Sequence, residues 1–131
     1  MKRDMDLIRQ ILLEIEAHDD GRGDAFALHI AGLADATVFG HLMLLSDAGL
    51  IDGERRQKPE GACFMPQRLT WTGQEFLSSI RDPSIWIETK KKIGDLIDGV
   101  TFDVVRDTAS ALARQSIATL EKISRQKSTR L

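Results

Sequence analysis

The chain has 131 residues, of which 42% are hydrophobic and 29% are charged, and its formal net charge is −2. This length suits one domain, or one domain with a helical extension, and it allows folding without metal or disulfide support. A lone cysteine excludes an internal disulfide, no apolar run reaches the ~18 residues of a membrane span, and acids among the first apolar residues argue against a signal peptide, so we expect a cytoplasmic protein.

The charge is distributed unevenly along the chain. Residues 1–52 hold four cations and ten acids, a net charge of −6, whereas residues 53–92 carry +3 and the remaining residues carry +1. An anionic partner is therefore expected to meet the second half of the chain.

The first predicted element is a helix over residues 4–17. Its apolar residues recur at helical spacing: Met5, Ile8, Leu12 and Ile15. Acids and glycines then indicate a loop, and the weak alternation of residues 25–30 suggests a short strand.

The stretch "ATVFGHLMLLSDAGLIDG", residues 36–53, is predicted to be a helix that leads into a strand. Asp35 is expected to cap the helix by accepting a backbone N–H bond, and Gly49 to end it in the left-handed conformation. The preceding "AGLADA" is short for a positioning helix, so a single turn is the alternative.

Two strands follow, over residues 50–56 and 62–70. In the turn between them, Pro59 presets one dihedral angle and Gly61 relieves the exit. The next helix runs to about residue 81, with either Thr70 or Thr72 as its cap.

Two further helices are predicted near the C-terminus. Asp82 and Pro83 begin one, which is expected to end at Asp98 and Gly99. Thr101 caps the other, over about residues 102–124. The apolar stripe of this last helix consists of Phe102, Val105, Ala109, Leu112, Ile117, Leu120 and Ile123.

The order of elements predicts a mainly α fold with a small β-hairpin, namely a winged helix-turn-helix core plus a C-terminal helical extension. We expect a winged-helix domain over residues 1–82, with its wing at about residues 50–70. Residues 83–131 then form helices that pack on this domain or dimerise.

Four stretches of the sequence also resemble a known family: "MKRDMDLIRQILLEIE", "HLMLLSDAGLI", "RLTWTGQEFL" and "IRDPSIW". They cover most of residues 1–92, and they resemble the phage- and prophage-borne domain-of-unknown-function family 2513. The resemblance implies a winged-helix-like domain of bacteria or their viruses, without a settled activity. Met43 departs from the resemblance, because relatives tend to carry a polar or basic residue at this position.

The helix in the reading position offers little for base recognition. Val38, Leu42 and Leu45 form its expected core-facing line, with His41 near the edge. Its outward face would then consist of Thr37, Gly40, Met43, Leu44 and Asp47. Base reading usually needs Arg, Lys, Asn or Gln, so Thr37 is the one candidate donor to a base edge.

The same outward face suits a protein partner better than DNA. Met43 and Leu44, with Gly40 allowing close approach, form a small apolar patch of the kind that methionine makes adaptable. The alternative is that another element covers them as ordinary core.

The wing carries the candidate phosphate contacts Arg55, Arg56, Lys58 and Arg68. Its alternative interpretation is a solvated hairpin. Four cations would make about three or four phosphate contacts, fewer than the 6–10 of strongly salt-dependent binders. DNA binding is therefore expected to require a homodimer, held through the last helix. Trp71 and Trp86 are expected in the core, and Lys90, Lys91 and Lys92 on a solvated helix face.

No catalytic, metal or cofactor site is predicted. Cys63 lies in an apolar strand and is expected to be buried and inert. The three histidines, His18, His29 and His41, share no metal-ligand spacing. The leading hypothesis is a non-catalytic DNA-binding regulator of phage or prophage origin that uses its wing. The alternative is a phage factor that binds and inhibits a host enzyme or defence complex, with its acidic first half mimicking nucleic acid.

Overall fold

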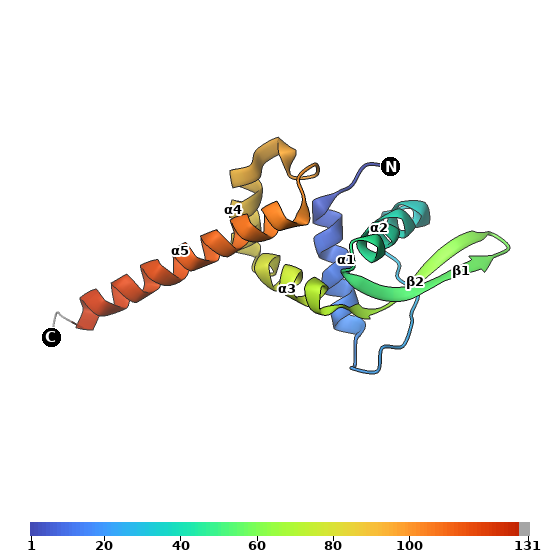
Figure 1. The fold of residues 1–131 in the computed structure, drawn as a ribbon, viewed down its shortest axis with the longest axis horizontal. Helices are drawn as coiled ribbons and strands as arrows, with labels where there is room; N and C mark the ends of the chain where they lie inside the picture. The colour runs from blue at the N-terminus through green and yellow to red at the C-terminus, as the bar shows by residue number, and fades with distance from the viewer. Residues whose placement is uncertain (129–131) are drawn as a thin grey trace. The chain divides into compact units, whose positions relative to one another are not determined.

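The computed structural model of the chain describes residues 1–128. The elements in chain order are α1 (Met5–His18), α2 (Asp35–Asp47), β1 (Ile51–Lys58), β2 (Gly61–Leu69), α3 (Trp71–Ile80), α4 (Pro83–Ile93), the 3-10 helix η1 (Gly94–Leu96) and α5 (Phe102–Ser128) (Figure 1). Over these residues the fold is mainly helical with a two-stranded antiparallel hairpin, which confirms the predicted class. The chain forms two compact units, a first unit Met1–Ser78 and a second unit Ser79–Leu131.

Helix α1 supplies much of the core of the first unit. Asp4 caps it, because its carboxylate accepts the N–H of Leu7 at 3.2 Å. Two adjacent stripes of the helix are buried: Met5, Leu7, Ile8, Ile11, Leu12 and Ile15. The helix ends at His18, whose ring stacks on Phe26 with the centroids 4.3 Å apart. The predicted range is confirmed to within one residue.

The segment between α1 and α2 is not a strand, so that prediction is wrong. Phe26 N–H donates to the carbonyl of Pro66 at 3.1 Å, as an added strand would. Pro66 has no N–H to return the bond, so the reciprocal pair of an antiparallel ladder cannot form there. The expected positioning helix is reduced to a turn, closed by Leu33 N–H donating to Ile30 O at 3.2 Å.

Helix α2 begins differently from the prediction and ends as predicted. Asp35 is its first residue rather than its cap, and Ala34 holds the cap position without a side-chain bond. The Asp35 carboxylate lies instead 3.6 Å from Nδ1 of His29. At the other end Gly49 has a φ of 74°, and Leu50 N–H donates back to Leu45 O at 3.0 Å. This is the Schellman pattern, which turns the chain directly into β1.

The hairpin of β1 and β2 turns within the predicted residues 57–61, but the turn is shorter than predicted. Lys58 pairs with Gly61 around Pro59 and Glu60, and Gly61 has a φ of 132°. The register shifts between the pairs Asp52–Arg68 and Gly53–Pro66, which leaves Gln67 as an extra residue. This shift places Asp52 directly opposite Arg68.

The start of α3 resolves the choice between the two threonines in favour of Thr70. Its hydroxyl accepts the N–H of Gly73 at 3.0 Å and donates to the carbonyl of Gly49 at 2.6 Å. Thr70 therefore caps α3 and joins it by a hydrogen bond to Gly49, which follows α2. Gly73 packs against the Leu50 carbonyl so closely that a Cβ atom would collide with it.

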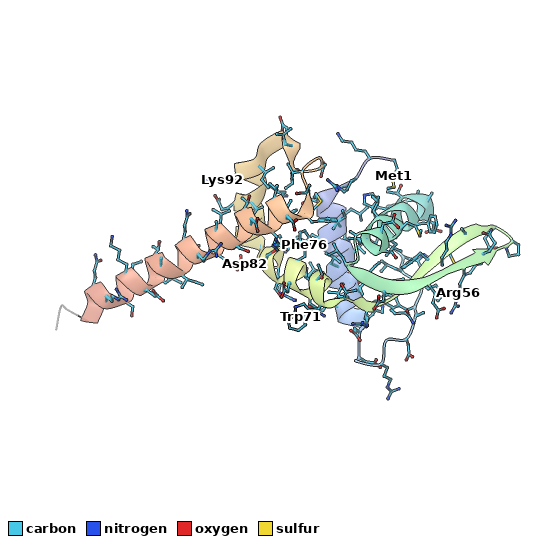
Figure 2. All side chains as sticks on the ribbon, viewed as in Figure 1. Met1, Arg56, Trp71, Phe76, Asp82 and Lys92 are labelled. Carbon is cyan, nitrogen blue, oxygen red and sulfur yellow. The ribbon has the colours of Figure 1, made fainter. Side chains whose placement is uncertain are left out.

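The prediction that Trp71 is in the core is wrong. Its side chain is 78% exposed, and its indole N–H donates to a carboxylate oxygen of Glu75 at 2.7 Å (Figure 2). The residue lies two positions before buried Gly73, roughly 200° around the helix from the packed face.

The second unit is built on α4 packed against α5. Asp82 caps α4 as predicted, accepting the N–H groups of Ser84 and Ile85 at 2.8 and 3.1 Å. The helix ends at Gly94, whose φ is 69°, rather than at Asp98 and Gly99 as predicted. The core of the second unit contains Trp86, which is buried as predicted, together with Thr89, Val105 and Ala109. Although α5 is the longest helix described, none of the helices over residues 1–128 has both the length and the hydropathy to cross a membrane.

Replacing Thr70 by alanine should lower the free energy of unfolding by about 1–2 kcal/mol, because both the α3 cap and the bond to Gly49 are lost. Thr72→Ala is the matched control, since Thr72 is exposed, and it should change stability by no more than roughly 0.5 kcal/mol. Urea denaturation of both variants tests this, and equal losses would contradict the assignment of the cap.

Candidate functional site

Helix α2, which the sequence predicts to be the reading helix, is a core helix. Val38, Leu42 and Leu45 are 3%, 2% and 0% exposed, as predicted. All other residues from Thr37 to Ser46 are buried or half-buried, and the exposed positions of the helix are at its two ends. The middle of α2 therefore presents no open face that a DNA groove would receive.

His41 belongs to the buried face of α2. It is 1% exposed, whereas the sequence predicts it near the edge of the core. The backbone N–H of Asp4 donates to Nε2 of His41 at 2.9 Å, and Nδ1 donates to the carbonyl of Thr37 at 2.8 Å. Because the backbone N–H of Asp4 can only donate, Nε2 is the acceptor, and Nδ1 carries the proton that bonds the Thr37 carbonyl. The imidazole thus joins the start of α1 to the middle of α2.

The predicted protein-binding residues are partly covered by the same arrangement. Gly40 lies beneath the thioether of Met1, where an added Cβ would collide with the sulfur. Met43 and Leu44 are half-buried, as is Thr37, the one candidate base contact. The three residues Gly40, Met43 and Leu44 therefore do not form an open patch, and their role in binding stays a prediction.

The wing cations are partly neutralised by acids of the same hairpin. Arg56 pairs with Glu54 at 2.6 Å, and Arg68 pairs across the strands with Asp52 at 2.8 Å. The Arg55 guanidinium lies 5.9 Å from the ring centroid of Phe39, and Lys58 is exposed beside the turn. These four side chains therefore do not form a continuous basic groove.

Net charge supports the same conclusion. The hairpin, residues 51–69, holds four cations and three acids, a net charge of +1. The whole first unit holds eight cations and thirteen acids, a net charge of −5. A surface of this sign repels polyanions and favours a basic partner.

A cleft of about 420 Å³ opens between residues 27–29, the first half of α2 and strand β2. Its floor consists of Leu28, Val38, Leu42 and Phe64, all of them buried. Its rim carries the exposed residues His29, Asp35, Lys58 and Glu60. This volume falls in the range of ligand pockets. The sequence pattern did not reveal the cleft, because three separate segments form it.

Two of the residues considered for catalysis or metal binding, Cys63 and His29, line the same cleft. Cys63 is half-buried on β2, not buried as predicted. His18 bonds the carbonyl of Glu14, His29 lies beside Asp35, and His41 is in the core. Within the part of the chain that is described, no three metal-ligating side chains come together.

The apolar stripe of α5 divides into two parts with different surroundings. Val105 and Ala109 are fully buried in the core of the second unit. Ile117, Leu120 and Ile123 are 57%, 66% and 45% exposed. The entire segment from Arg114 to Gln126 is exposed, so this half of the helix carries an open apolar stripe.

Two comparisons with known proteins bear on the chain. A family model described as "Hypothetical protein (DUF2513)" matches residues 2–100, which confirms the resemblance found in the sequence. A protein of Haemophilus influenzae, described as "Uncharacterized protein", is 32% identical over 118 residues. That match covers 90% of this chain and all of the Haemophilus protein.

His41→Ala should lower the free energy of unfolding by about 2–4 kcal/mol, since it empties a buried site and leaves the Asp4 N–H without its acceptor. His29→Ala is the control, because the His29 side chain is 74% exposed, and its effect should stay within roughly 0.5 kcal/mol. Thermal unfolding followed by circular dichroism measures both. A small effect at His41 would show that the link between α1 and α2 is unimportant.

Proposed function

This chain belongs to the DUF2513 family, and we propose that it is a non-catalytic winged-helix module that acts by binding proteins, including a second copy of itself. The observation that carries the proposal is the open apolar stripe on α5, formed by Ile117, Leu120 and Ile123. Large apolar side chains at helical spacing on an exposed helix favour association with another protein surface.

The length of the exposed segment strengthens this argument. Residues 114–126 are all exposed, so this part of α5 gains little from burial of apolar side chains. Isolated helices shorter than about 12–15 residues are marginal in water. Pairing of two copies along the stripe would bury the three apolar side chains and support the helix. The net charge of this segment is +2, which physiological salt largely screens.

Duplex DNA is the weaker candidate partner. Residues 35–47 contain no Arg, Lys, Asn or Gln, so α2 lacks the side chains that usually distinguish bases. With Arg56 and Arg68 held by acids, a dimer would offer about four phosphate contacts, from two copies of Arg55 and Lys58. This is fewer than the 6–10 contacts of strong binders.

One observation still favours DNA as a second candidate. The hairpin follows α2 directly, as the wing follows the reading helix in DNA-binding winged helices, and it exposes Arg55 and Lys58. Under this alternative the protein is a dimeric regulator that contacts phosphates through its wings.

The phage or prophage origin and a host enzyme or defence complex as target remain predictions from the family resemblance. A cytoplasmic location likewise remains an expectation, based on the lone cysteine.

A random-sequence duplex should bind this protein with a Kd no lower than about 10 µM at roughly 0.15 M salt, because the first unit is acidic and α2 is covered. Fluorescence anisotropy of a labelled duplex over a salt series measures this. Submicromolar binding that weakens steeply with salt would overturn the proposal in favour of the wing. In that case Lys58→Gln should weaken binding, whereas Arg22→Gln, in the loop after α1, should not.

Leu120→Glu should abolish self-association, since it places a charge at the centre of the exposed stripe of α5. Ala118→Glu is the matched control, because it adds the same charge to an exposed position roughly 200° away on the helix. Sedimentation equilibrium at concentrations on the order of 100 µM should show dimers of the wild type and the control, and monomers of Leu120→Glu. A monomeric wild type would contradict the proposed pairing.

A further inference from the structure

The outer edge of strand β2 is where a partner has room to add a strand. In an antiparallel pair, successive residues point their N–H and C=O groups alternately toward and away from the neighbouring strand. The backbone N–H and C=O groups of the closing pair Lys58–Gly61 point toward each other. Those of Ala62 and Phe64 therefore point away from β1, as does the carbonyl of Pro66. The bond from Phe26 N–H to the Pro66 carbonyl confirms this alternation independently.

The chain itself uses this edge at one point only within the described residues. Phe26 bonds Pro66, but residues 27–30 then leave the strand rather than pairing with Phe64 and Ala62. The space between them is the cleft of about 420 Å³. An outward-facing strand edge thus borders an apolar floor.

We propose that this edge binds an extended segment of a partner protein as an added β-strand, with an apolar side chain in the cleft and basic residues beside it. The inference rests on the proposed function, because it names the chemistry of the protein partner. Backbone bonds to Ala62 and Phe64 hold the added strand, and the floor of Leu28, Val38 and Leu42 receives the apolar side chain.

Charge determines the preference for basic flanking residues. Asp35 and Glu60 are exposed on the rim of the cleft, and the first unit as a whole has a net charge of −5. Lys58 on the same rim offsets part of this charge without reversing it. A segment with Lys or Arg on either side of an apolar residue is therefore attracted, and an acidic or phosphorylated segment is repelled.

The test uses a labelled peptide, Lys-Thr-Val-Leu-Val-Thr-Lys with blocked ends, titrated against the full chain by fluorescence anisotropy. The control peptide carries Glu in place of both Lys residues. The basic peptide should bind, and the acidic peptide should bind at least about tenfold more weakly. Alkylation of Cys63, which borders the cleft, should slow when the basic peptide is bound.

Ala62→Pro removes one outward-pointing N–H group of β2 and should lower the affinity for the basic peptide by roughly fivefold to tenfold. Gln57→Pro is the matched control, because Gln57 pairs with Ala62 and its N–H faces the opposite edge of the hairpin. The double variant Asp35→Asn with Glu60→Gln changes exposed side chains only, and it should weaken the basic peptide without affecting folding.

Absence of peptide binding at about 1 mM would overturn the inference. Equal loss in Ala62→Pro and Gln57→Pro would also overturn it, as would displacement of the peptide by duplex DNA. Dimers that still form through α5 in such a case would leave the proposed function standing, so the two failures are distinguishable.

Discussion

A buried imidazole fixes the architecture of the first unit. The ring of His41 accepts the N–H of Asp4 and donates to the carbonyl of Thr37, so the start of α1 is tied to the middle of α2. Met1 lies over Gly40, and residues 37–46 of α2 are buried or half-buried. Because the helix predicted to read DNA is covered over these residues, the proposed function assigns binding to other surfaces.

The two proposed binding surfaces lie one in each unit, and they differ in chemistry. The first unit has a net charge of −5 and offers a strand edge beside an apolar cleft. The second unit offers an open stripe on α5, whose exposed segment has a net charge of +2. A module with one self-associating helix and one peptide-binding edge would present two peptide sites per dimer, which raises its affinity for a partner with repeated segments.

Local chemistry made much of the fold predictable from the sequence. Asp82 before Pro83 and Gly49 after α2 act within one helical turn, and the structure shows both as predicted. The predictions were wrong where residues from other parts of the chain determine the local structure. Asp35 is not a cap, and Trp71 is solvent-exposed although its sequence neighbours are apolar. The candidate site was harder still, because the pairing of Arg68 with Asp52 depends on the register shift at Gln67. The cleft requires three segments to meet, which no single stretch of sequence encodes.

The enclosure of α2 is the central claim, and hydroxyl-radical footprinting of the full chain tests it most directly. After correction for intrinsic reactivity, Phe39, Met43 and Leu44 on α2 should be modified several-fold more slowly than exposed Trp71. Modification of the α2 side chains at the same rate as Trp71 would contradict the account, because it would show that the helix presents an open face after all.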